Sequence, residues 1–283
     1  MLPNRISVTK TVQHAIYAQF RAHLTRLNIR KRISLYRSWK DTPKPDKSEV
    51  VIIAGGPSFT REIAEAIIEN KKYLDVVAIN FYCLNDHSQL LIPNYYVLSD
   101  PIHLKAIDNA LIEKNMMLKS YIQASACRLC VPYGESWDEY AKPFIFFDDS
   151  ENIFSKNVDP RLPRGYPSNT MFKAIALMLA MGYEKIYLTG FDYDYPRKIF
   201  LDKDNKLMLR DEHHYKAVDS YYGNIYDSVG HALHWWAQDY WHLKKLSSPR
   251  IVNVTDTSLV DAFQRMSQYA FIEHLKTCAS LHV

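Results

Sequence analysis

Two aspartates separated by one residue, Asp192 and Asp194, stand in the stretch "LTGFDYDYP" (188–196), directly after an apolar run. Carboxylates at this spacing suit a divalent cation. A polar segment at the end of a buried strand also suits a nucleotide, and a simple turn has the same composition. The residues alone leave these three interpretations open.

A glycine turn, Gly55-Gly56-Pro57-Ser58, ends a second apolar run that starts at residue 49. Backbone N–H groups in such a turn, followed by a helix N-terminus, can contact a phosphate or a sugar. The turn lacks the three spaced glycines of a dinucleotide fingerprint and the Gly-Lys-Ser/Thr of a P-loop, which disfavours NAD and ATP. A strand-to-helix turn without a ligand fits the sequence equally well.

Further polar residues follow other apolar runs. Asn80 and Asp100 are suited to hydrogen-bond a base or ribose, or to cap a turn. Asn169 and Thr170 begin an expected helix and have the same two interpretations. His231 follows a glycine at another expected helix start, where the helix dipole disfavours its protonation, so it is a candidate general base or a surface residue.

The pattern of apolar runs and helical periodicity predicts the elements that position these residues. Strands are expected at 49–54, 75–80, 95–100, 120–125, 143–147, 184–190 and 250–255, and helices at 60–73, 101–115, 169–183 and 258–275. This alternation predicts an α/β, Rossmann-like fold with a mainly parallel sheet and helices on both faces. The candidate residues would then meet at the carboxyl ends of the strands.

Domain boundaries follow from composition. Residues 1–48 are expected to form a basic, partly helical leader and linker, and residues 49–283 a single domain. Within that domain, residues from about 195 to 230 are polar and aromatic with no convincing regular core, which favours a lid. Tyrosines in and beside this stretch, among them Tyr195, can donate hydrogen bonds to a phosphate.

Charge is concentrated in the leader. Residues 1–47 hold eleven Lys/Arg against two Asp, a surplus of nine, and since the whole chain is +4 the remainder is 4 − 9 = −5. The body therefore does not favour nucleic acid as a partner. The leader can form a basic amphipathic helix on the anionic inner face of a membrane, or a solvated arm packed on the body.

The cysteines and the lack of long apolar runs indicate the cellular compartment and the cofactor content. The four cysteines include one C-x-x-C pair, Cys127 and Cys130, which is more consistent with free cytosolic thiols than with a zinc or redox centre. We find no apolar run long enough for a membrane span and no secretory signal. We expect a cytoplasmic protein without a cofactor or metal, and a homo-oligomer is compatible with the sequence.

The segments "VIIAGGPSF", "AINFY", "MGYEKIYLTGFDY" and "VGH" together resemble the bacterial sialyltransferases of glycosyltransferase family 42 and the related motility-accessory-factor glycosyltransferases. The resemblance covers about residues 49–270. It implies a GT-A-like fold and an inverting, metal-independent transferase that moves sialic acid, or a related 2-keto acid sugar, from a CMP donor to a hydroxyl of a cell-surface glycan. Lipopolysaccharide or capsule biosynthesis is the implied process.

The resemblance also implies roles for residues that match the family motifs. His231 would be the general base. The residues implied to bind the donor are Gly55, Gly56, Ser58, Asn80, Asp100, Asn169, Thr170, Gly190, Phe191, Asp192 and Tyr195. The glycine turn is one residue shorter than in the family, and Asp194 aligns without a gap with a phosphate-binding tyrosine, so Tyr195 takes that role only if the register shifts by one.

Two alternatives remain at this stage. One is a metal-dependent nucleoside-diphosphate-sugar transferase in which Asp192 and Asp194 form a D-x-D metal site. The other is a non-catalytic nucleotide- or glycan-binding protein held at a membrane by its leader.

Overall fold

The computed structural model describes residues 16, 20, 39, 45–100, 103, 109–132, 144–146, 159–160, 169–211, 220–221 and 229–280. At positions 109–110, 144–146, 211, 220–221, 229–232, 234–235, 238 and 279–280 the description covers the backbone alone.

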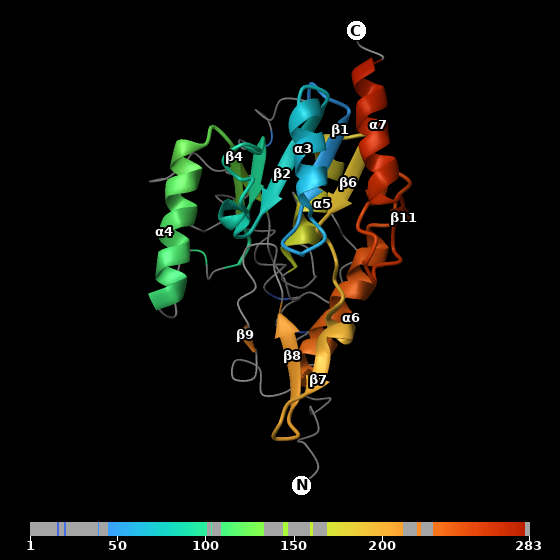
Figure 1. Cartoon of the computed structure of the whole chain (residues 1–283). Coiled ribbons are helices and arrows are strands. Elements are labelled where there is room, and N and C mark those ends of the chain that lie inside the picture. Colours follow the sequence, from blue (N-terminus) through green and yellow to red (C-terminus); the bar gives the residue numbers. More distant parts are fainter. Residues whose placement is uncertain are drawn as a thin grey trace.

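An eight-stranded sheet forms the centre of the molecule, in the order β11-β10-β6-β1-β2-β3-β4-β5, and its pairs are all parallel (Figure 1). Its strands are β1 (Glu49–Ile53), β2 (Leu74–Ile79), β3 (Tyr95–Val97), β4 (Arg128–Pro132), β5 (Phe144–Phe146), β6 (Lys185–Thr189), β10 (Ile251–Asn253) and β11 (Gln264–Arg265). The predicted α/β, Rossmann-like class with a mainly parallel sheet is confirmed.

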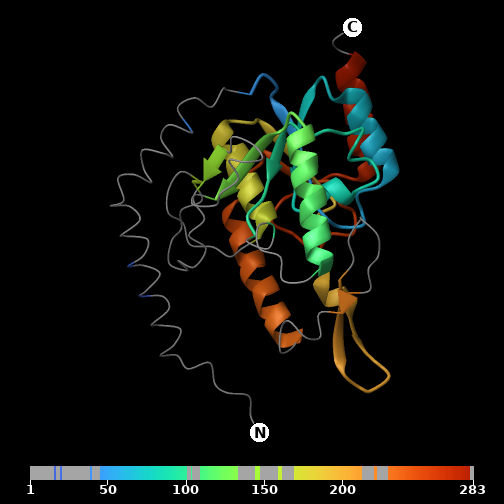
Figure 2. The same ribbon diagram turned by 90° about the vertical axis from the view of Figure 1, so that its left-hand side faces the viewer.

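The central strands are mostly apolar because both faces of the sheet are covered. Helices α3 (Arg61–Asn70), α4 (Asn109–Ala124) and α7 (Gln268–Ser280) cover one face, and α5 (Thr170–Met181) with the end of α6 (Val229–Lys245) covers the other (Figures 1 and 2). Alternate residues of β1 divide between the two cores: Val50 and Ile52 pack toward α5, and Val51 and Ile53 pack toward α3.

Local signals in the sequence set the ends of the helices. Thr60 caps α3 by accepting a hydrogen bond from the Ile63 N–H. Asn169 caps α5 in the same way, with Phe172 as donor, and Gly182 ends α5 at a φ of 99°. The expected cap role of Asn169 is therefore confirmed.

Two sequence-based assignments are wrong. Residues 120–124 belong to α4, because Leu118, Tyr121 and Ile122 bury their side chains at helical spacing, and the neighbouring segment Arg128–Pro132 supplies the strand. The helix expected over 258–275 starts only at Gln268, since Gln264 and Arg265 pair with the edge of β10 instead. Of the helix expected at 101–115, the described part begins at Asn109.

The expected lid stretch contains regular structure. After the short 3₁₀ helix η3 (Tyr195–Lys198), strands β7 (Ile199–Leu201), β8 (Leu207–Asp211) and β9 (Ser220–Tyr221) form a three-stranded antiparallel sheet. Asp202 shapes the β7–β8 turn by accepting hydrogen bonds from the N–H groups of Asp204 and Lys206. The expectation of no regular core is thus wrong here, and Figure 1 shows the hairpin projecting beyond the carboxyl ends of the central strands.

Candidate functional site

The sheet topology marks one place for a ligand. From β1 the chain passes through α3 to β2 and continues outward to β5, and α5 then returns it to β6 on the opposite side of β1. The direction of winding therefore reverses between β1 and β6, and open parallel sheets bind ligands in the crevice beyond the carboxyl ends of such a pair. The two segments singled out from the sequence, Gly55–Ser58 and Gly190–Asp192, follow these two strands.

Asp192 joins three strand ends by hydrogen bonds. Its Oδ2 accepts from the hydroxyl (2.8 Å) and N–H (3.3 Å) of Ser58, and its Oδ1 accepts from the Thr257 hydroxyl (2.6 Å). The side chain is 5% exposed. A buried carboxylate needs such donors to offset lost hydration. Both oxygens of Asp192 are therefore used inside the protein, and the carboxylate fixes the glycine turn rather than pointing into solvent.

Gly56 is required by the closeness of this contact. A Cβ at Gly56 would lie 1.9 Å from Asp192 Oδ2 and 2.5 Å from the Gly190 carbonyl oxygen. The Gly56 N–H donates to that carbonyl at 2.8 Å, and Gly190 has a φ of 65°. The absence of side chains on both glycines lets the two turns approach each other and leaves backbone as the lining of the crevice.

The second aspartate of the D-x-D sequence has a different partner. Asp194 forms an ion pair with Lys198 at 3.1 Å, and both side chains are largely buried. Between the aspartates, Tyr193 has a left-handed φ of 47°. A cation held by both carboxylates would have to displace Lys198 from Asp194 and the hydroxyls from Asp192, so the arrangement does not favour a metal. The half-buried Tyr195 follows and packs edge-on against the Tyr193 ring.

Asn80 ends β2 in the left-handed region, with a φ of 52°. Its Oδ1 lies 3.4 Å from Nε2 of His103, and its carbonyl accepts from the Tyr96 hydroxyl at 2.7 Å. Burial lowers the pKa of His103 to about 4, against the opposing charge of Asp100. The imidazole is therefore neutral at pH 7, and a neutral ring beside a carboxamide suits contacts with an uncharged base or ribose.

The start of α5 is bound to both sides of the site. The Thr170 hydroxyl lies 2.8 Å from the Ser99 hydroxyl at the end of β3. Asn169 donates from Nδ2 to Asp239 on α6 at 3.3 Å. The strand ends from β6 to β3 thus form a row of three strand spacings, about 14 Å long.

Asp239 connects α6 to this row. Its Oδ2 also accepts from the Tyr193 hydroxyl at 2.7 Å, whereas its buried Oδ1 has no hydrogen-bond partner among the residues that the structure describes. Burial raises the pKa of Asp239 to about 6, although the hydrogen bonds from Tyr193 and Asn169 and the charge of Lys173 act in the opposite direction. Asp239 therefore changes its charge near neutral pH, inside the contact between α6 and the D-x-D segment.

Aromatic rings reinforce the same contact. Trp236 stacks on Tyr193 and Tyr240, and its indole N–H donates to the Tyr193 carbonyl at 3.0 Å. His231 is the third residue of α6, as expected for a helix start, and its backbone alone is described. It precedes Asp239 by eight residues, about 12 Å along the helix axis. Since Leu243 at the other end of α6 is in the core, His231 belongs to the outer end of the helix.

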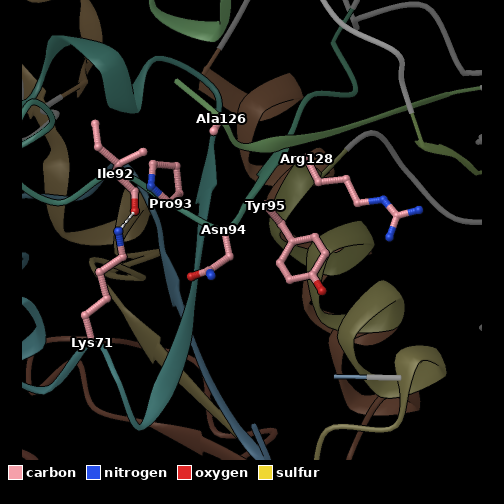
Figure 3. A pocket seen from close by; sticks show the side chains of 7 residues that line it. All are labelled: Lys71, Ile92, Pro93, Asn94, Tyr95, Ala126 and Arg128. Carbon is pink, nitrogen blue, oxygen red and sulfur yellow. Dashed lines mark hydrogen bonds between the residues drawn. The ribbon is translucent and has the colours of Figure 1, made fainter. Parts of the chain in front are cut away.

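A depression elsewhere on the molecule is not part of this site. It has a volume of about 420 Å³ and is lined by Lys71, Ile92, Pro93, Asn94, Tyr95, Ala126 and Arg128 (Figure 3). Tyr95 begins β3 and Arg128 begins β4, so the depression opens at the amino ends of the strands. Parallel sheets do not place their ligands at that end.

Three residues of the site were not predicted from the sequence. Thr257 follows β10, so the rule that located Ser58 and Asp192 at strand ends also pointed to it. His103 and Asp239 carry no such signal, because only tertiary packing brings them to Asn80 and Asn169.

Comparison with known proteins supports the fold. No protein-family model matches the chain, and no curated protein matches it. Among solved structures, the MAf glycosyltransferase from Magnetospirillum magneticum AMB-1 is similar, with a TM-score of 0.50 and 14% sequence identity over 85% of this chain. The match spans only 38% of that protein. The similarity shows a shared fold. Within the described residues, no helix combines the length and hydropathy needed to cross a bilayer.

Proposed function

We propose that the chain is an inverting glycosyltransferase that transfers sialic acid, or a related 2-keto acid sugar, from a CMP donor to a hydroxyl of a cell-surface glycan. The observation that supports this most is the meeting of Ser58, Asp192 and Thr257 at the reversal point of the sheet, beside a glycine turn. The fold shared with a glycosyltransferase agrees with it.

The donor would lie along the row of strand ends. The turn of Gly55, Gly56 and Ser58 would contact it, with the side chain absent at Gly56 to allow a close approach, and Gly190 and Phe191 would contribute backbone from the end of β6. Asn80, with Asp100 and the neutral His103, would contact the base and ribose, and Asn169 and Thr170 the sugar carboxylate. Asp192 would act through Ser58, since both of its oxygens already accept hydrogen bonds.

The leaving phosphate requires hydrogen-bond donors that stabilise it and still allow the product CMP to dissociate. Tyr195 at the start of η3 would supply a phenol hydroxyl, and Lys198, three residues further on, would add positive charge if it left Asp194. His231 would accept the proton of the attacking hydroxyl. Its place at the outer end of α6 suits an acceptor that approaches from solvent, and the β7–β8 hairpin beside α6 is suited to limit the entry of water.

A metal-dependent transferase is less well supported. Asp192 is bound to Ser58 and Thr257, and Asp194 is bound to Lys198, so the two carboxylates do not share a ligand position. A departing monophosphate also requires less compensation by a cation than a diphosphate.

The leader is proposed to hold the enzyme at the inner face of the membrane. Its described residues Ile16 and Phe20 are apolar, four apart and exposed, which places them on one side of a helix. Trp39, in contrast, packs against the core that contains α5. The membrane contact would therefore belong to the part of the leader before Trp39.

The test of the catalytic assignment is the variant His231→Ala. Donor turnover is measured as release of CMP from CMP-sialic acid, with and without sialyl acceptors, and CMP binding is measured by calorimetry. We expect transfer to fall by at least about 100-fold, the contribution of a general base, with CMP affinity unchanged. His87→Ala, outside the site, is the matched control. Undiminished transfer by His231→Ala would show that His231 is not the general base.

A further inference from the structure

A cluster at the opposite end of the sheet joins three types of metal-binding side chain. His274 and Cys278 stand four residues apart on α7, and Glu49 is the first residue of β1. One ligand atom from each lies within 4.8 Å of the other two. The i, i+4 spacing puts two side chains on one side of a helix, as required for two ligands of one ion.

The distances approach those of a tetrahedral zinc site. His274 Nε2 lies 3.0 Å from Glu49 Oε2 and 3.6 Å from Cys278 Sγ. Zinc bonds of about 2.0 Å to nitrogen and oxygen and about 2.3 Å to sulfur give ligand separations of roughly 3.3 Å and 3.5 Å, respectively. These two separations would need to change by only a few tenths of an ångström to accept the ion, and the third, between Glu49 and Cys278, is within 4.8 Å.

Several polar groups of the cluster converge on one ring nitrogen. Three polar atoms surround His274 Nε2, because the Tyr187 hydroxyl lies 2.9 Å from it in addition to Glu49 and Cys278. An imidazole nitrogen carries either one hydrogen or one lone pair, so it makes one good hydrogen bond here. A cation bound by the Nε2 lone pair would be a common partner for the carboxylate and the sulfur.

The surroundings suit a bound ion that is reached from solvent. The side chains of His274 and Glu49 are 31% and 21% exposed, and Cys278 is half-buried. The Tyr187 hydroxyl also lies 3.3 Å from Glu49 Oε1, at the edge of the cluster, where it can hydrogen-bond the ligating carboxylate.

We propose that Glu49, His274 and Cys278 bind a zinc ion, with water in the fourth position, and that this ion fastens α7 to the amino ends of β1 and β6. The mixture of thiolate, imidazole and carboxylate selects zinc over magnesium or calcium, which prefer oxygen ligands alone. When zinc binds, the Cys278 thiol loses its proton to solvent and the His274 Nε2 lone pair is donated to the metal. The proposal does not depend on the function proposed above.

The test uses the untagged full-length chain, first treated with EDTA and a reductant and then dialysed. Zinc is titrated by calorimetry, and cobalt is added as a spectroscopic probe, since a thiolate ligand gives a sulfur-to-cobalt charge-transfer absorption. We expect one zinc per chain, the charge-transfer band, and a rise in melting temperature on addition of zinc.

Matched variants locate the site. Cys278→Ser should abolish the band and weaken zinc binding more than about 100-fold, beyond what outer-shell changes cause. Cys127→Ser, which removes another half-buried thiol, should change neither. Circular dichroism and the melting temperature without metal verify that both variants fold. No zinc binding by the wild-type chain, equal binding by Cys278→Ser, or bound cobalt without a thiolate band would each overturn the proposal.

Discussion

The two ends of the parallel sheet differ in how their polar groups are satisfied. At the carboxyl ends, Asp192 has a donor for each carboxylate oxygen, and glycines let backbone segments approach closely. At the amino ends, His274 is surrounded by more polar partners than one ring nitrogen can serve. The first arrangement is preorganised for an organic ligand that contacts backbone, and the second is suited to a cation.

The largest expected effect comes from filling the space at Gly56. Gly56→Ala brings a Cβ against Asp192 and the Gly190 backbone. We expect a loss of more than about 3 kcal/mol in the free energy of unfolding, because backbone as well as side chain must move. Urea denaturation measures it.

Gly182→Ala is the control for this change. Gly182 has a φ of 99° and nothing within 4 Å of its Cβ position, so only backbone strain of about 1 to 2 kcal/mol is expected. Equal losses in the two variants would show that the Gly56–Asp192 contact is not close.

The paired variants Asp192→Asn and Asp194→Asn separate a structural role from metal binding. An asparagine at 192 keeps one acceptor oxygen for three donors, so we expect a loss of about 2 to 3 kcal/mol in the free energy of unfolding. Asp194→Asn removes the carboxylate charge but keeps a side-chain oxygen that can accept a hydrogen bond from Lys198, so we expect a smaller loss of about 1 kcal/mol. Urea denaturation and donor turnover, with and without manganese, measure both. Manganese-dependent activity lost equally in the two variants would instead support a metal site.

Asp239 should make stability depend on pH. Its folded-state pKa of about 6 exceeds the ordinary 3.8, so the folded state binds the carboxyl proton more tightly than the unfolded state. The stability that this proton contributes is fully present below about pH 4 and is lost as pH rises through 6. The free energy of unfolding of Asp239→Asn should therefore exceed that of wild type by up to about 3 kcal/mol above pH 6 and should equal it near pH 4. Unfolding at several pH values tests this. For the control Asp204→Asn, in the exposed β7–β8 turn, the difference in stability from wild type should be the same at every pH.

The smallest effect on the fold is expected from the leader. Deleting residues 1–36 keeps Trp39 on the core and keeps Lys47, which pairs with Asp75 at 3.2 Å. Stability should change by less than about 0.5 kcal/mol, whereas binding to vesicles containing anionic lipid, measured by sedimentation, should be lost. Retained binding by the shortened chain would place the membrane contact elsewhere.

The sequence predicted the parts of the fold and site that depend on local pattern. Apolar runs ended at Ile53 and Thr189, and the strand-end rule then identified Ser58 and Asp192 as neighbours, as the structure shows. It failed where a tertiary contact overrides local preference. The segment 120–125 has strand-like composition, yet Tyr121 and Ile122 pack as helix residues.

Long-range polar contacts also could not be predicted from the sequence. Asp239 gains its raised pKa only through burial against Asn169 and Tyr193, and Glu49 meets His274 across 225 residues. Neither pair has a spacing that a motif could encode. The D-x-D sequence allowed a metal, but Asp192 is bound by Ser58 and Thr257 from other strand ends, and Asp194 pairs with Lys198 four residues further on.

The central claim, a CMP-sugar site at the carboxyl ends of β1, β2 and β6, is tested most directly by thermal shift with CMP, UDP and GDP. The comparison uses wild type, Asn80→Gly and Cys278→Ser. Asn80→Gly removes the carboxamide but keeps the φ of 52° that glycine accepts. We predict that CMP alone raises the melting temperature of wild type and Cys278→Ser, and that Asn80→Gly loses this response. A response to UDP or GDP instead of CMP, or a full CMP response in Asn80→Gly, would contradict the account.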